Sequence, residues 1–173
     1  MIPIGLFYGS TDGATAAVAR RIADLCAEAG WAEVELLDVA EYDLGEMEAF
    51  AVLLLGIPTW NTGQMQRDWE AVFPEIAELD LTGKRVALVG LGDQAGYPDT
   101  FADALIFFAD AVQERGATLV GRWPTDGYDF RNSWAVQDGM FVGLVLDEIN
   151  QPELTEGRLR AWLEQVRREI VLY

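Results

Sequence analysis

The stretch LFYGSTDGAT, residues 6–15, decides the fold, because it joins a buried strand to a helix through a loop of small and hydroxyl residues. The apolar run Ile2–Tyr8 predicts a strand that is buried on both faces. From Thr15 to Ala29 the apolar residues recur at helical spacing, and Gly30 is a typical helix stop. A strand followed directly by a helix is the first half of a unit that builds parallel sheets.

Strand and helix patterns alternate along the rest of the chain, which predicts one α/β domain over residues 1–173 with a doubly wound, five-stranded parallel sheet and helices on both faces. The stretch Gly121–Gly139 breaks this alternation, and its four aromatic residues predict that it packs against the domain. Further strands are expected at Glu33–Leu37, Phe50–Gly56 (ended by Pro58), Arg85–Gly90 and Thr118–Val120, and further helices at Gln66–Ile76, Asp99–Arg115 and Glu153–Leu172.

The composition narrows the function classes. The 173 residues include 29 Asp and Glu but only 12 Lys and Arg, giving a net charge of −17. Because nucleic acids are bound by clustered Lys and Arg, we expect no nucleic-acid partner. The acidity suits protein partners with basic faces, but it is equally explained by solubility alone, and the charge does not separate these two readings. A single cysteine and no histidine exclude an internal disulfide, a Ser-His-Asp triad and imidazole metal sites. No signal peptide and no stretch long enough for membrane insertion are recognised, so the expected location is cytoplasmic.

The loop Ser10–Thr15 is a candidate phosphate site. Backbone N–H groups at a helix start, with the hydroxyls of Ser10, Thr11 and Thr15, can donate hydrogen bonds to an anion. The loop lacks both the lysine of a Walker motif and the three glycines of a dinucleotide motif. It therefore favours a terminal phosphate monoester, although a plain helix N-cap by Ser10 or Thr11 explains this loop equally well by itself.

Two more loops follow the third and fourth predicted strands. Gly56–Gly63 contains Trp60, and Gly90–Tyr97 combines glycines with Tyr97. A single aromatic residue is more often part of the core or the plain surface. Ligands of open parallel sheets, however, bind beyond the carboxyl ends of the strands, where all three loops are expected. Together they predict a site for a planar ring that carries a phosphate.

These motifs resemble the flavodoxin family, specifically its long-chain type. The resemblance rests on four segments: Leu6–Ser10 with Gly13 and Thr15, Pro58–Asn61, Gly92–Tyr97, and Thr125–Phe130 with Phe141–Glu148. The last segment is similar to the insertion that splits the final strand in long-chain members. The resemblance implies a flavodoxin-like sheet of strand order 2-1-3-4-5 and a non-covalently bound flavin mononucleotide (FMN).

The resemblance also implies a role for each loop. The phosphate is expected at Ser10–Thr15 with Thr59 beside it, and Asp12 is expected to point to water. Trp60 and Tyr97 would sandwich the isoalloxazine ring. Asp93 would reach the N3 edge of this ring, and the Asn61–Thr62 backbone would face its N5 atom. Asp147 would contact the ribityl hydroxyls. The full predicted FMN-binding set is Ser10, Thr11, Asp12, Gly13, Ala14, Thr15, Pro58, Thr59, Trp60, Asn61, Thr62, Gly63, Leu91, Gly92, Asp93, Gln94, Tyr97 and Asp147.

The implied function is that of a low-potential one-electron carrier, not an enzyme, that shuttles between flavin semiquinone and hydroquinone. One negative charge at ~10 Å disfavours the anionic hydroquinone by ~1.7 kcal/mol at an effective dielectric constant near ~20, which suits an acidic protein. In a turn over Trp60–Gly63, β-branched Thr62 would resist the positive φ that a peptide flip requires, and so weaken the semiquinone relative to glycine.

Two other classes are compared with the carrier. An FMN-dependent NAD(P)H:quinone reductase on the same fold needs an open ring face, and Trp60 and Tyr97 on both faces argue against it. A phosphoryl-accepting receiver domain needs an Asp at the end of the third strand, where this chain has Gly56-Ile57-Pro58.

The partners implied by the resemblance and the charge are basic faces of redox proteins. Ferredoxin–NADP reductase, the iron protein of nitrogenase and photosystem I are of this kind, and the second makes nitrogen fixation a candidate process. We expect the protein itself to be a monomer.

Overall fold

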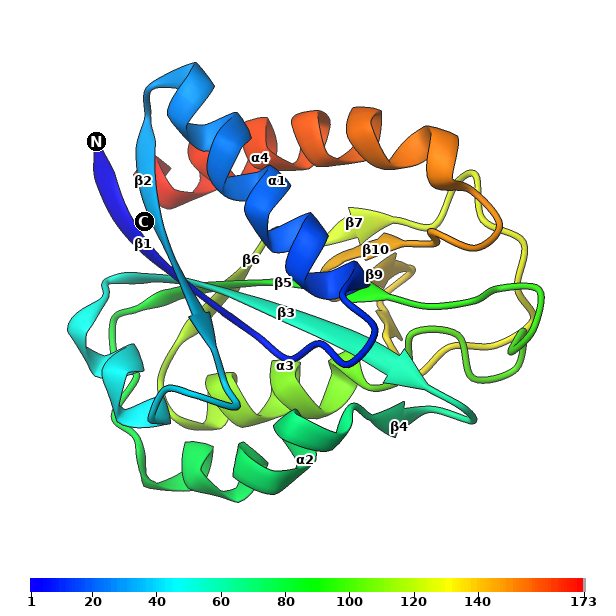
Figure 1. Ribbon diagram of the computed structural model, residues 1–173, viewed down its shortest axis with the longest axis horizontal. Helices are drawn as coiled ribbons and strands as arrows, with labels where there is room; N and C mark the ends of the chain where they lie inside the picture. The colour runs from blue at the N-terminus through cyan, green and yellow to red at the C-terminus, as the bar shows by residue number, and fades with distance from the viewer. Residues whose placement is uncertain (173) are drawn as a thin grey trace.

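The central sheet places the first strand between the second and the third. In the computed structural model, which describes residues 1–172, β1 (Ile2–Tyr8) lies between β2 (Ala32–Asp38) and β3 (Val52–Trp60), and β5 (Arg85–Leu91) lies beyond β3 (Figure 1). All of these pairs are parallel. The predicted α/β class and the order of the first four strands in the sheet are confirmed.

The outermost strand position is divided between two short strands. β6 (Thr118–Val120) pairs with the beginning of β5, and β10 (Leu144–Leu146) pairs with its end, both in parallel. The predicted order 2-1-3-4-5 with a split last strand is therefore confirmed.

Helices cover both faces of the sheet. α1 (Ala14–Ala29) and α4 (Thr155–Leu172) lie on one face, and α2 (Arg67–Val72) and α3 (Leu105–Glu114) on the other (Figure 1). Alternate residues of β3 enter different layers: Leu54 packs in the α1–α4 core, and Leu55 in the α2–α3 core. Short 3-10 helices complete the chain, namely η1 (Leu44–Ala49), η2 (Phe73–Glu78) and η3 (Pro152–Leu154).

The insertion forms its own small antiparallel sheet between β6 and β10. Its strands are β7 (Trp123–Pro124), β8 (Val136–Gln137) and β9 (Met140–Phe141), with β9 in the middle. The ring of Phe101 lies 5.3 Å from that of Phe130 and 6.0 Å from that of Phe141, measured between centroids. The prediction that this segment packs against the domain is confirmed.

Three predicted boundaries were wrong. β3 continues through Pro58 to Trp60. Its pairing with β1 ends at Gly56, but the residues after Gly56 still pair with β5 and with the short β4 (Gln64–Met65), and these pairs extend the strand. α3 begins at Leu105, not at Asp99, since Ala102 has a φ of 56° and the buried Phe101 packs on the insertion.

The third wrong boundary concerns the helix expected at Gln66–Ile76. It changes to a 3-10 helix at Phe73, and Pro74 stands near this change.

None of the helices within residues 1–172 is long and apolar enough to cross a membrane.

Candidate functional site

A cavity of about 240 Å³ opens at the carboxyl ends of β1, β3 and β5, where the three predicted loops meet. Trp60 and Tyr97 contribute aromatic surfaces to it from two different loops, and Tyr97 is 37% exposed. The lining consists of Asp12, Ala14, Thr15, Pro58, Thr59, Trp60, Asn61, Leu91, Gly92, Asp93, Tyr97, Glu148 and Ile149.

The loop before α1 uses its own side chains to shape its backbone. Ser10 Oγ accepts hydrogen bonds from Gly13 N (3.2 Å) and Ala16 N (3.4 Å), and the exposed Asp12 turns its Oδ1 back to accept one from Ala14 N (3.0 Å). Gly13 has a φ of 92°, which an L-residue rarely adopts. Ser10, Thr11 and Gly13 belong to this loop but do not line the cavity.

This loop retains N–H groups that can receive an anion. Within residues 1–172, the backbone N–H groups of Thr11, Asp12 and Thr15 donate to no protein acceptor. They lie at the N-terminal end of α1, where the helix dipole favours negative charge. The donors therefore fit a phosphate group, although Asp12 opposes it electrostatically.

A fully buried glutamine supports the loop from beneath. Gln66 Nε2 donates to Thr11 Oγ1 (3.0 Å), and Gln66 Oε1 accepts from Trp69 N (3.1 Å) at the start of α2. The indole of Trp69 donates from Nε1 to Gly56 O (2.9 Å). Sequence reasoning missed Gln66, because its contact with Thr11 spans 55 residues and no local pattern signals it.

The Trp60 loop is the connection between β3 and β4. Thr59 pairs with Met65, and Trp60 pairs with Gln64. The positive φ angles fall on Asn61 (48°) and Gly63 (89°), residue types that tolerate them, and not on β-branched Thr62. Asn61 lines the cavity, whereas Thr62 and Gly63 do not.

Two hydrogen bonds hold the aspartate of the loop after β5, one from the same loop and one from the loop after β10. Asp93 Oδ1 accepts from Gly96 N (2.8 Å) and from Asn150 Nδ2 (2.7 Å). Tyr97 N donates to Asp93 O (2.9 Å), which closes the loop. Asp93 and Tyr97 are thus placed together at the cavity, as the sequence predicts.

Asp147 and Gln94 differ from expectation. Asp147 is fully buried and Gln94 is 4% exposed, and neither lines the cavity. Burial raises the pKa of Asp147, but hydrogen bonds from Gln94 and Asn150 outweigh it and hold the pKa below the ordinary value. The expected contact of Asp147 with ribityl hydroxyls does not fit this position, and its neighbours Glu148 and Ile149 line the cavity instead.

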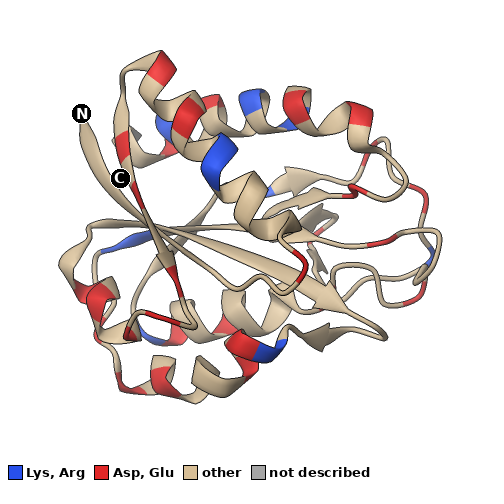
Figure 2. Cartoon of the chain, in the orientation of Figure 1, with Lys and Arg blue, Asp and Glu red and all other residues tan. Residues whose placement is uncertain are grey.

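The cavity is acidic. Asp12, Asp93 and Glu148 line it, and its described lining contains no Lys or Arg. Acidic residues also occur on both helix layers and on loops beyond the carboxyl ends of the strands (Figure 2). Two aromatic surfaces, free N–H donors at one end and a carboxylate at another fit a planar ring that carries a phosphate.

Comparison with known proteins agrees with this geometry. The family model described as Flavodoxin matches residues 6–162. The chain is 44% identical to a flavodoxin of Nostoc sp. over 169 residues, covering 98% of each chain, and 44% identical to flavodoxin 1 of Escherichia coli, covering 97% of this chain and 94% of that one.

Solved structures agree as well. A crystal structure of Fusobacterium nucleatum flavodoxin bound to flavin mononucleotide superposes with a TM-score of 0.91 at 32% identity, covering 98% of this chain and 99% of that one. From its fold, its loops and these relatives, the chain belongs to the flavodoxin family.

Proposed function

We propose that this chain is an electron-transfer protein, not an enzyme, that carries single electrons on non-covalently bound FMN. The observation that carries the proposal is the cavity at the carboxyl ends of the strands, where Trp60 and Tyr97 meet the N-terminal end of α1. The Fusobacterium nucleatum relative, whose structure contains FMN, supports the choice of ligand. When bound, FMN supplies the ability to accept and release one electron at a time.

Different residues of the chain would bind different parts of FMN. The N–H groups of Asp12 and Thr15, which line the cavity, would receive the phosphate, together with that of Thr11 from the adjoining part of the loop and with Thr59 beside them. Trp60 and Tyr97 would hold the ring system, and Asp93 would meet its polar edge. In this arrangement amides and the helix dipole, and no cation, balance the phosphate charge.

The same residues favour a low reduction potential. Adding an electron to the cofactor adds negative charge, and Asp12, Asp93 and Glu148 already bring negative charge to the cavity. One such charge at ~10 Å costs about 1.7 kcal/mol at an effective dielectric constant near ~20. The aromatic faces of Trp60 and Tyr97 are electron-rich and act in the same direction. The reduced protein would therefore be a strong one-electron donor.

The binding experiment compares FMN with riboflavin, which lacks the phosphate. We expect the apoprotein to bind one FMN per chain and to bind riboflavin much more weakly. Trp60→Ala should weaken both ligands by a similar factor, because it removes a ring contact worth about 1–3 kcal/mol when buried. Equal affinity of the unaltered chain for the two ligands would contradict the phosphate site.

A second assay separates the carrier from the reductase. The loaded carrier should oxidise NAD(P)H only through a partner reductase, whereas a quinone reductase would oxidise it directly. Rapid direct oxidation of NAD(P)H by the loaded chain would favour the enzyme.

The proposed partners are redox proteins with basic faces. Ferredoxin–NADP reductase, nitrogenase iron protein and photosystem I are the candidates, and the net charge of −17 supports steering toward such faces. We propose that the chain acts as a monomeric single domain in the cytoplasm. Electron transfer to the true partner should slow as salt is raised, and a rate independent of salt would contradict electrostatic docking.

A further inference from the structure

One buried carboxylate joins two loops that follow neighbouring strands. Asp147 Oδ2 accepts hydrogen bonds from Gln94 N (2.9 Å) and Gln94 Nε2 (2.8 Å), in the loop after β5. Asp147 Oδ1 accepts from Ile149 N (3.1 Å) and Asn150 N (2.9 Å), in the loop after β10. Asn150 Nδ2 adds a fifth bond, to Asp147 Oδ2 (2.9 Å). Five donors around one fully buried side chain make a rigid junction.

The junction reaches the cavity through one side chain. Asn150 Nδ2, which bonds Asp147, also donates to Asp93 Oδ1 at 2.7 Å. Asp93 in turn accepts from Gly96 N beside Tyr97. Hydrogen bonds therefore connect Asp147 to the loop that carries Asp93 and Tyr97, although Asp147 does not line the cavity itself.

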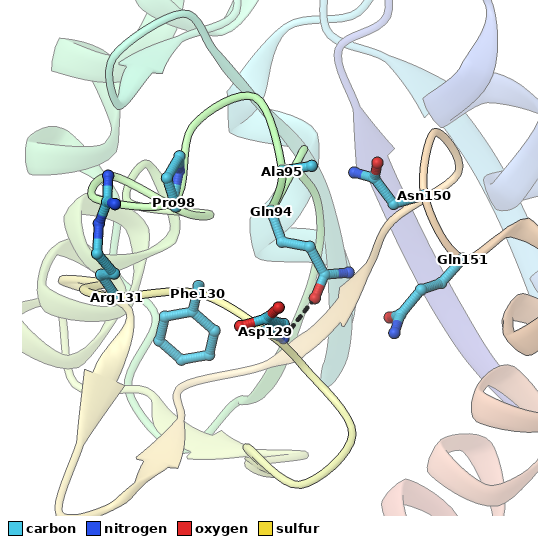
Figure 3. Close-up of a pocket in the computed structure, with 8 residues that line it drawn as sticks. All are labelled: Gln94, Ala95, Pro98, Asp129, Phe130, Arg131, Asn150 and Gln151. Atoms are coloured by element: carbon cyan, nitrogen blue, oxygen red, sulfur yellow. Dashed lines mark hydrogen bonds between the residues drawn. The ribbon is translucent and has the colours of Figure 1, made fainter.

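The junction also reaches the insertion. Gln94 Oε1 accepts a hydrogen bond from Asp129 N (2.6 Å), and Figure 3 shows this bond within a separate cavity of about 440 Å³. Gln94 thus donates to Asp147 with one end of its carboxamide and accepts from the insertion with the other. Nearby, Gln151 Nε2 donates to Gly127 O (2.9 Å), so a second glutamine holds the same turn of the insertion.

We propose that Asp147 is a positioning residue: through Gln94 and Asn150 it orders the Asp93–Tyr97 loop for the flavin ring and couples that loop to the insertion at Asp129. The part about the flavin ring rests on the proposed function. The coupling to the insertion concerns the protein alone and can be measured without any cofactor.

Asp147→Asn tests the proposal with almost no change in volume. The new amide can direct only one oxygen toward the five donors, so an NH₂ group must face N–H donors of Gln94 or Asn150. A buried donor left without an acceptor destabilises its loop, and we expect the opening of the loop to become about 10-fold more frequent.

Hydrogen–deuterium exchange on the apoprotein is the first measurement. In Asp147→Asn, exchange in residues 92–97 and 127–131 should rise together by about 10-fold, while residues 10–15 keep their rate. Glu169→Gln is the matched control, because Glu169 Oε2 accepts from Gly121 N (2.6 Å) away from the cavity lining. It should raise exchange only near residue 121.

Ligand affinity and a double-mutant cycle are the second measurement. Asp147→Asn should weaken FMN and riboflavin by the same factor, about 10-fold, because the altered loop faces the ring and not the phosphate. When Asp147→Asn is combined with Asp93→Ala, the loss of binding free energy should be smaller than the sum of the losses in the two single variants. Glu169→Gln should leave both affinities unchanged.

Gln94→Met keeps the proposal testable if Asp147→Asn does not fold. It removes the side-chain bonds to Asp147 and Asp129 N but retains the bond from Gln94 N. It should raise exchange in residues 127–131. Unchanged exchange there in the variants that fold, or unchanged ring affinity in Asp147→Asn, would overturn the proposal. If the unaltered chain binds no FMN, the proposed function fails, and the exchange data still decide whether the two loops are coupled.

Discussion

Replacing Gly9 by alanine puts a methyl group into a space that is already filled. The new Cβ would overlap Gln66 Oε1 and lie 2.7 Å from Trp69 Cδ1. Both side chains are fully buried and hydrogen-bonded, so neither can move without breaking the bonds to Thr11 Oγ1 or Gly56 O. Overpacking costs roughly 1–3 kcal/mol, and a broken bond to a buried partner adds about 1–3 kcal/mol. We expect Gly9→Ala to lower the free energy of unfolding by about 3 kcal/mol.

Urea unfolding of the apoprotein measures this loss, and the melting temperature should fall by roughly 6–12 °C for a chain of this size. Affinity for FMN should fall more than affinity for riboflavin, because Thr11 belongs to the phosphate loop. Gly157→Ala in α4 is the control, since its Cβ would meet open space, and it should gain about 0.5–1 kcal/mol. The reasoning would be refuted if Gly9→Ala lowered the free energy of unfolding by less than about 1 kcal/mol, or if it weakened the affinities for FMN and riboflavin equally.

Four further predictions concern single residues. Asp12→Asn should change FMN affinity only a few-fold, because the exposed side chain keeps an oxygen for Ala14 N; a gain of about 30-fold or more in a calorimetric titration would show a carboxylate aimed at the phosphate. Thr62→Gly should raise the reduction potential of the first one-electron step, from oxidised flavin to semiquinone, because glycine freely adopts the positive φ that the peptide flip requires. Potentiometry that finds this potential unchanged or lower would contradict the prediction. Burial raises the pKa of Cys26 to about 12, so near pH ~8 mass spectrometry should find the native thiol unalkylated until urea is added; rapid labelling of the folded chain would argue against this burial. Burial also raises the pKa of Tyr128 to about 12, so its contribution to the free energy of unfolding should be complete below about pH 10 and should be lost as the pH rises toward 12. Tyr128→Phe should show a smaller loss, and urea midpoints that stay level over this interval would exclude the effect.

The sheet could be predicted because its signals are local. Apolar runs and glycine or proline stops place the strands, and the alternation with helices gives their parallel order. The start of α3 could not be predicted this way. The side chain of Phe101 is apolar at helical spacing, but it packs on Phe130 and Phe141, which follow it by 29 or more positions in the sequence.

The residues of the cavity differ in the same way, since local motifs predict some of them and long-range contacts decide the others. Trp60, Asp93 and Tyr97 occur in contiguous motifs, and the structure brings them together. Asp147 was expected at the ligand, but its burial depends on Gln94, a contact over 53 residues that no local pattern encodes. Supporting contacts of this kind are set by tertiary packing, so the sequence predicts the cavity wall better than the layer behind it.

Anaerobic reductive titration of the FMN-loaded chain tests the central claim most directly. With redox dyes as indicators, we predict one FMN per chain that is reduced in two well-separated one-electron steps, the second at the lower potential. A single two-electron step, or a chain that binds no flavin at all, would contradict the account.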